Sequence, residues 1–297
     1  MTTASRPDSA AALPRLTIGM PLYNNERTLE RAVSSLLRQT FRDFVLILSD
    51  DYSRDNTSTI ARQLAREDPR IRFVQQRLNL NYGNFRYVLA EARTEMFVFA
   101  AGDDWWEPEF LEECVALLDQ RPEAVCVVPR ARFYPEDGES FLAMGTFPLA
   151  GSPAENIAEY LRKLYDNTRM YGVFRTEVAR RAFPRRDHHA FDLTFSVATL
   201  REGVHLEIPR ELMGREVTPT ERYVEYVPRD NLPGLPRLFP LLPMTRSLLF
   251  EMRMPRDRRV LRALFDANLV RHRDYMRRYY PRVSRIEEPL LRALRLA

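Results

Sequence analysis

Short apolar runs alternate with stretches of helical periodicity through the first half of the chain. Buried strands are predicted at residues 16–20, 44–48, 70–74, 96–100 and 125–128, where apolar runs end at polar or turn-forming residues. Between the strands, apolar residues recur at helical spacing over residues 27–39, 56–65, 85–92 and 108–118. This alternation predicts an α/β fold, with an open, mostly parallel sheet covered by helices.

Polar clusters follow three of the predicted strands. Tyr23 and two asparagines come after the first strand, Asp50 and Asp51 after the second, and Asp103 and Asp104 after the fourth. In open α/β sheets, ligands bind in the crevice beyond the carboxyl ends of the strands. The pattern therefore predicts four carboxylates gathered at one edge of the sheet.

The periodicity is weaker after residue 130. A loop is predicted over residues 134–153, helices over 154–164 and 191–200, and strands over 170–174 and 204–208. Prolines at 228, 233, 236, 240 and 243 exclude a continuous helix and predict a connector. Residues 256–297 return to helical periodicity.

Composition is that of a globular protein, with 45% hydrophobic and 29% charged residues. The first 14 residues do not resemble a signal peptide, and no run approaches the ~18 apolar residues of a spanning helix, so we expect a cytoplasmic protein. Cys114 and Cys126 lie in apolar stretches and are expected to be buried thiols. The 45 basic residues are nearly balanced by 41 acidic ones, and no basic-aromatic module occurs, so nucleic acid is not an expected partner.

Three segments resemble family 2 inverting glycosyltransferases, which have the GT-A fold. They are LTIGMPLYNNE at residues 16–26, VLILSDDYSRDNT at 45–57 and GDDWWEP at 102–108. The resemblance continues weakly through YGVFR at 171–175 and the helix at Asp192, and it fades beyond about residue 215. It implies a nucleotide-sugar donor, most simply UDP-linked, a divalent cation (Mg²⁺ or Mn²⁺), and a glycan or lipid-linked acceptor.

The resemblance also implies which residues bind the nucleotide. Asp51 would accept a hydrogen bond from the base, since an ionised carboxylate is an acceptor only, while Pro21 and Tyr23 would pack on the base. Asn84, in the predicted loop before the third helix, is a candidate donor contact, and Asp103 would reach the ribose or the metal. Capping of a turn by Asp51 and simple loop punctuation by Asn84 are the structural alternatives.

Asp104 is the implied direct metal ligand, assisted by Asp103, because carboxylates and diphosphate oxygens together suit Mg²⁺ or Mn²⁺. Ala101 departs from the family pattern, since many members have another aspartate there. Asp192 is the implied catalytic base that takes the acceptor proton, with Asp187 as the second candidate. An N-cap role for Asp192 fits the local sequence equally well.

The resemblance divides the chain into four parts. They are a disordered N-terminus (1–14), a nucleotide-sugar-binding half (15–130), an acceptor-side half of the same domain (131–227), and a connector with a helical extension (228–297). The arginine-rich tail is expected either to be a solvated face over a packed apolar stripe or to lie on an anionic membrane at its inner face. Oligomeric state is not predicted.

Two other classes of protein have sheets of this type, a nicotinamide-dependent oxidoreductase and a catalytically silent nucleotide-binding protein. A nicotinamide-dependent oxidoreductase would need a glycine-rich turn after the first strand, and residues 21–25 (PLYNN) are not glycine-rich. A catalytically silent nucleotide-binding protein of the same fold stays open, because of Ala101 and the loose match around Asp192.

Overall fold

The computed structural model describes residues 13–217 and 239–293. In its first half strands and helices alternate as predicted. The elements are β1 (Leu16–Leu22), α1 (Leu29–Leu37), β2 (Phe44–Asp50), α2 (Thr57–Glu67), β3 (Ile71–Gln75), α3 (Tyr82–Glu91), β4 (Met96–Phe99), β5 (Trp105–Trp106), α4 (Phe110–Gln120) and β6 (Ala124–Pro135).

The second half contains shorter elements and a helical extension. They are β7 (Phe141–Leu142), α5 (Pro153–Arg162), η1 (Thr168–Tyr171), β8 (Val173–Arg175), α6 (Thr176–Ala182), α7 (Phe191–Thr199), β9 (Val204–Val217), α10 (Leu242–Arg246), η2 (Ser247–Glu251), α11 (Arg258–Tyr279) and α12 (Pro281–Ala293).

Several predicted boundaries in this half were wrong. The strand expected at 170–174 begins only at Val173, because residues 168–171 form a turn of 3₁₀ helix. The loop expected at 134–153 includes the end of β6 and all of β7. Pro228, Pro233 and Pro236 of the expected connector lie outside the described residues. Pro243 lies in the first turn of α10, where a backbone N–H is not needed.

The nine strands of the described residues form one sheet in the order β3-β2-β1-β4-β8-β6-β9-β5, with β7 beside β6. Strands β3, β2, β1 and β4 are parallel, as expected, whereas β8 is antiparallel to both β4 and β6. Strand β6 is parallel to β9. The parallel half arises because each of its strands is followed by a crossover helix.

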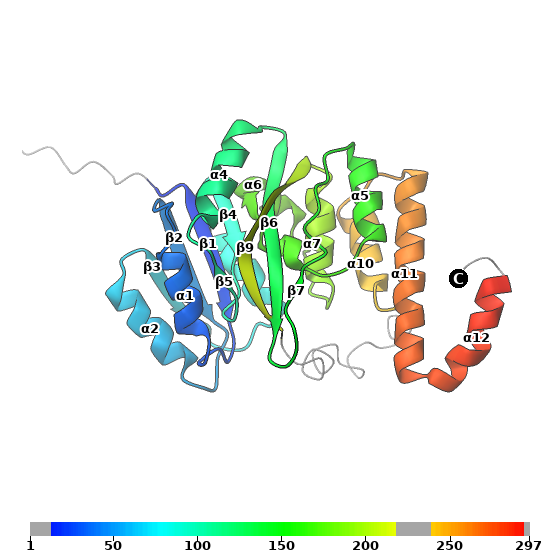
Figure 1. Cartoon of the computed structure of the whole chain (residues 1–297), viewed down its shortest axis with the longest axis horizontal. Helices are drawn as coiled ribbons and strands as arrows, with labels where there is room; N and C mark the ends of the chain where they lie inside the picture. Colours follow the sequence, from blue (N-terminus) through cyan, green and yellow to red (C-terminus); the bar gives the residue numbers. More distant parts are fainter. Residues whose placement is uncertain (1–12, 218–238, 294–297) are drawn as a thin grey trace, which may run out of the picture.

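The core lies on both faces of this sheet. Helices α1 and α2 cover one face in the foreground of Figure 1, while α3, α6 and α7 pack around an aromatic cluster on the other. Phe99 of β4 is central to this cluster and contacts the rings of Phe85, Phe183 and Phe195. Helix α7, which carries Asp192, is thereby fixed against the sheet.

The C-terminal helices form a layer at one end of the molecule (Figure 1). Helix α11 packs along α5, and Arg259 and Arg271 bond to Glu155 and to the carbonyl of Leu164. The buried side of α11 is an apolar stripe that includes Val260. A packed apolar stripe beneath a solvated face was one of the two expectations for the tail. Within the described residues, no helix has the length and apolar character needed to cross a bilayer.

Candidate active site at the carboxyl edge of the sheet

The carboxyl ends of β1, β2 and β4 meet at one edge and are joined by hydrogen bonds. The Asp51 N–H donates to the carbonyl of Leu22 (2.8 Å), and the Asn24 N–H donates to Ser53 Oγ (3.0 Å). Thr28 Oγ1 donates to the carbonyl of Gly102 (2.7 Å). The loops that follow these three strands, which carry Asp51, Asp103 and Asp104, are therefore held together at one edge of the sheet.

Asp51 is 4% exposed and holds the segment before α3. Its Oδ1 accepts the N–H of Leu80 (2.7 Å) and its Oδ2 accepts the N–H of Asn81 (2.9 Å). Burial raises the pKa of Asp51, and these two backbone donors act in the opposite direction. The carboxylate thus fixes the loop beside the expected nucleobase site. One lone pair on each of its oxygens is left for another donor.

Asn84 differs from its prediction. It lies within α3 and not in a loop, and it is buried, with its amide donating to the carbonyl of Ser49 (2.8 Å) and its Oδ1 accepting from Ser49 Oγ (2.6 Å). Its side chain therefore ties α3 to β2 and is already committed. Pro21, in β1, and Tyr23, just after it, are both half-buried at the edge.

Asp104 is held by the pairing of two strands. Trp105 of β5 lies opposite Gly214 of β9, where an added Cβ would lie only 2.1 Å from the indole ring. Only glycine allows this close approach, and the register places Asp104 beside the next two residues of β9. The Glu216 N–H donates to Asp104 Oδ1 (3.2 Å), and Arg215 Nε donates to Oδ2 (3.1 Å).

Arg215 is the main functional candidate that the sequence did not reveal. Its guanidinium lies 4.6 Å from the ring centre of Tyr171 and 5.0 Å from that of Phe133, and it forms a buried ion pair with Asp104. Cation–π contacts on both rings fix its position. The predicted strand at 204–208 ended too early to suggest this placement, since β9 continues to Val217.

Asp104 and Asp192 are joined through Arg215 and Asn167. Arg215 Nη1 donates to Asn167 Oδ1 (2.9 Å), and Asn167 Nδ2 donates to Asp192 Oδ2 (2.8 Å). Together with the Arg215–Asp104 bond, this gives one continuous network, which we call the Asp104–Asp192 relay. The implied metal ligand and the implied base therefore belong to a single site.

The position of Asp192 differs from the capping alternative. It is the second residue of α7, after the N-cap Ala190, and its Oδ1 accepts the N–H of Leu193 (2.8 Å). Asp187, the second candidate base, is exposed and pairs with Arg86 instead. Of the two carboxylates, only Asp192 belongs to the relay.

Burial dominates the electrostatics of these carboxylates. It raises the pKa of Asp104 to about 7 against the opposing influence of Arg215, and it also raises the pKa of Asp103. The pKa of Asp192 is likewise raised by burial, while the hydrogen bond from Asn167 lowers it. A carboxylate with a raised pKa is a stronger base at neutral pH, which suits a proton acceptor.

The carboxylates of Asp103 and Asp104 suit Mg²⁺ or Mn²⁺ in donor type. The described part of the chain has no group of three or more His, Cys, Asp and Glu residues that could hold a metal ion. Arg215 Nε already lies 3.1 Å from Asp104 Oδ2. The two carboxylates therefore fit a cation only if the phosphates of a ligand complete its coordination.

Comparisons with known proteins identify the family. The family model described as "Glycosyl transferase family 2" matches residues 17–183, more than half of the chain. A GalNAc(5)-diNAcBac-PP-undecaprenol beta-1,3-glucosyltransferase of Campylobacter jejuni is 33% identical over 114 residues, 37% of this chain and 35% of that one. The chain spans less than half of the length of the first curated relatives, 47% and 35%.

Solved structures share the fold at low sequence identity. The structure of S. aureus TarS 1–349 in complex with UDP has a TM-score of 0.57 at 17% identity and covers 92% of this chain and 88% of its own. A mannosyltransferase, PcManGT from Pyrobaculum calidifontis in complex with GDP-Man and Mn²⁺, has a TM-score of 0.57 at 16% identity and covers 96% and 81%. The predicted α/β fold with a GT-A-like sheet is confirmed.

Proposed function

Since this chain belongs to glycosyl transferase family 2, we propose that it moves a sugar from a UDP-linked donor to an acceptor hydroxyl with inversion. The observation that supports the proposal is the Asp104–Asp192 relay, which links the proposed cation ligand Asp104 to the proposed base Asp192 by hydrogen bonds. The UDP-bound TarS structure supports the choice of nucleotide, and the Campylobacter relative supports a glycan or lipid-linked acceptor.

Asp192 is the proposed base. The acceptor oxygen attacks the anomeric carbon from the face opposite the diphosphate, the bond from that carbon to the diphosphate oxygen breaks, and Asp192 takes the hydroxyl proton. UDP leaves with the electron pair. Burial favours this step because it raises the pKa of Asp192. Asn167 is a positioning residue, since its amide fixes one carboxylate oxygen and leaves the remaining lone pairs for the proton.

The donor is proposed to bind along the carboxyl edge of the sheet. Pro21 and Tyr23 would pack on the uracil, and Asp51 would accept its N–H with the lone pairs not used by Leu80 and Asn81. Asp103 and Asp104 would hold the divalent cation together with the diphosphate, and the cation would offset charge on the leaving group. Arg215 lies behind Asp104 and adds fixed positive charge to the same region.

A panel of nucleotide diphosphates and UDP-sugars, with and without Mn²⁺, tests donor binding by thermal shift. We expect one UDP-sugar with Mn²⁺ to stabilise the protein selectively, because a ligand stabilises by RT ln(1 + [L]/Kd). Stabilisation by purine nucleotides instead would refute the UDP assignment.

Release of UDP then separates an enzyme from a silent binder. Asp192→Asn should keep donor binding and lower turnover by roughly 10²- to 10⁴-fold, the usual contribution of a general base. Asp187→Asn is the matched control, since Asp187 lies outside the relay. Donor binding without any UDP release by the wild type would favour the silent nucleotide-binding protein.

A further inference from the structure

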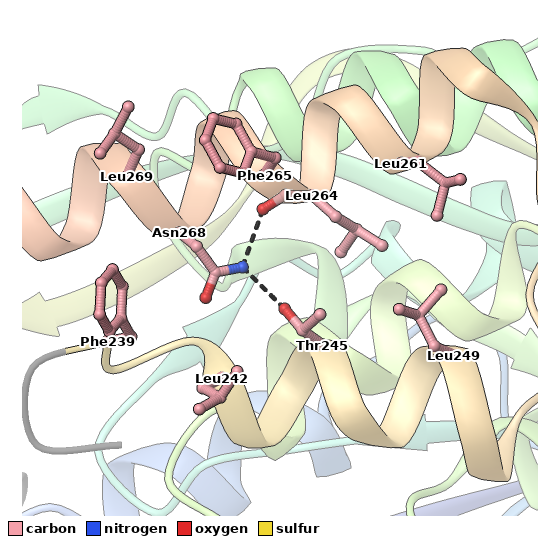
Figure 2. Close-up of a pocket in the computed structure, with 9 residues that line it drawn as sticks. All are labelled: Phe239, Leu242, Thr245, Leu249, Leu261, Leu264, Phe265, Asn268 and Leu269. Atoms are coloured by element: carbon pink, nitrogen blue, oxygen red, sulfur yellow. Dashed lines mark hydrogen bonds between the residues drawn. The ribbon is translucent and has the colours of Figure 1, made fainter. Parts of the chain in front are cut away.

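An apolar groove of about 410 Å³ lies between α10–η2 and α11 (Figure 2). Leucine and phenylalanine side chains make up most of its lining, including Leu242, Leu249 and Phe265. The one amide in it, Asn268, donates its NH₂ group to Thr245 Oγ1 (2.7 Å) and the carbonyl of Leu264 (2.8 Å), and its buried Oδ1 is the one lining atom found without a hydrogen-bond partner among the described residues. The groove therefore suits hydrocarbon.

Large apolar side chains are also exposed around this groove and on the neighbouring helices. Phe250 is 74% exposed and Ile286 is 72% exposed, and Leu261, Phe265 and Val283 are also exposed. These residues belong to η2, α11 and α12, which lie at the end of the molecule opposite α2 and β3 (Figure 1). An accumulation of exposed apolar residues at one end marks an interaction surface. We call residues 239–293 the C-terminal surface.

The charge of the C-terminal surface differs from that of the rest of the chain. Residues 239–293 contain 13 arginines and six acidic residues, a net charge of +7, whereas the whole chain carries +4, so the remaining residues carry −3. Four of the six acidic side chains are in ion pairs with arginine, and a fifth, Glu287, lies 2.6 Å from His272. Six arginines of this surface are exposed, and within the described ranges none of them forms an ion pair with a carboxylate. They are Arg246, Arg253, Arg256, Arg258, Arg282 and Arg285.

We propose that the C-terminal surface docks on an anionic phospholipid bilayer, with its arginines at the headgroups and its exposed apolar side chains in the acyl boundary. Arginine next to aromatic and aliphatic residues on amphipathic helices is the pattern that binds such interfaces. Charge complementarity selects this occupant. A second copy of the chain would bring two surfaces of charge +7 together, which opposes self-association through the same face.

Vesicle flotation of the full chain tests the proposal. We expect binding to vesicles that contain phosphatidylglycerol, weakened by salt, and no binding to vesicles of phosphatidylcholine alone. Arg282→Gln/Arg285→Gln should weaken binding by roughly 30-fold, since each arginine near such a surface contributes a factor of about five. Phe250→Asp/Phe265→Asp should abolish it.

Arg38→Gln/Arg66→Gln is the matched control, because it removes two exposed arginines, one directly after α1 and one in α2, at the other end of the molecule. We expect it to bind as the wild type does, and circular dichroism should show that all variants are folded. Equal binding to neutral vesicles, no binding to anionic ones, or equal loss in the control would overturn the proposal. The proposal would also be overturned if the wild type is a dimer and Phe250→Asp/Phe265→Asp converts it to a monomer that still binds vesicles. Because flotation uses no nucleotide, its result is independent of the proposed transferase activity.

Discussion

Replacing Arg215 by methionine tests the ion pair at the centre of the relay. The change keeps a long apolar side chain between Tyr171 and Phe133 but removes the only cation that bonds to Asp104 among the described residues. Both partners are nearly buried, with side-chain exposures of 10% for Arg215 and 1% for Asp104, so solvent screens the pair little.

The magnitude follows from the pKa of Asp104, which burial raises to about 7. Below that value Asp104 is protonated in wild type and variant alike, and the variant loses only hydrogen bonds. Above it, wild type releases the proton beside Arg215, while Asp104 in Arg215→Met keeps it. The folded variant then binds one more proton than the folded wild type, so its relative stability falls by about 1.4 kcal/mol per pH unit. At about pH 9 this amounts to roughly 3 kcal/mol.

Urea unfolding at about pH 6 and about pH 9 measures this difference. The control is Arg215→Met/Asp104→Asn, which removes the titrating group and should abolish the pH dependence of the destabilisation. If Arg215→Met destabilises the protein equally at both pH values, Asp104 does not titrate in this range and the electrostatic account of the relay is wrong.

Two further predictions concern turnover and the cation. Asn167→Ala removes a hydrogen bond that lowers the pKa of Asp192. A hydrogen bond to a charged group contributes ~1.5–3 kcal/mol, so the acid limb of the pH–rate profile of UDP release should move to higher pH by about 1–2 units. If the limb does not move, Asp192 does not take part in the rate-limiting proton transfer. Mn²⁺ alone should leave the melting temperature of the chelator-treated protein unchanged, because Asp103 and Asp104 supply too few ligands. Mn²⁺ together with UDP should raise the melting temperature. An equal rise with Mn²⁺ alone would contradict this.

The first half of the fold was predictable because its elements are local. Fully buried parallel strands appear as continuous apolar runs, and each strand from β1 to β4 was located within a few residues. The position of Asp51 and Asp104 at one edge followed from strand order alone. The second half was harder, since β8 has only three residues and the turn before it has no apolar periodicity of its own.

The missing site residues depend on contacts between distant segments. Arg215 reaches Asp104 across 111 positions of sequence because β5 pairs with β9, and a strand of two residues, Trp105 and Trp106, has no sequence signal. Asn167 occupies an ordinary turn, and nothing in its neighbourhood distinguishes it from a loop asparagine. Asn84 was misplaced for the opposite reason, since a glycine next to it suggested a loop where α3 has already begun.

The pairing of Trp105 with Gly214 has a consequence for motion. It fastens the segment after β4, in the proposed donor half, to β9, in the proposed acceptor half. A hinge between these halves would have to separate the indole from the glycine before the two could move apart. The separation of the proposed cation ligand Asp104 from the proposed base Asp192 is therefore set when the chain folds, and substrate adjustment is left to the loops around a fixed frame.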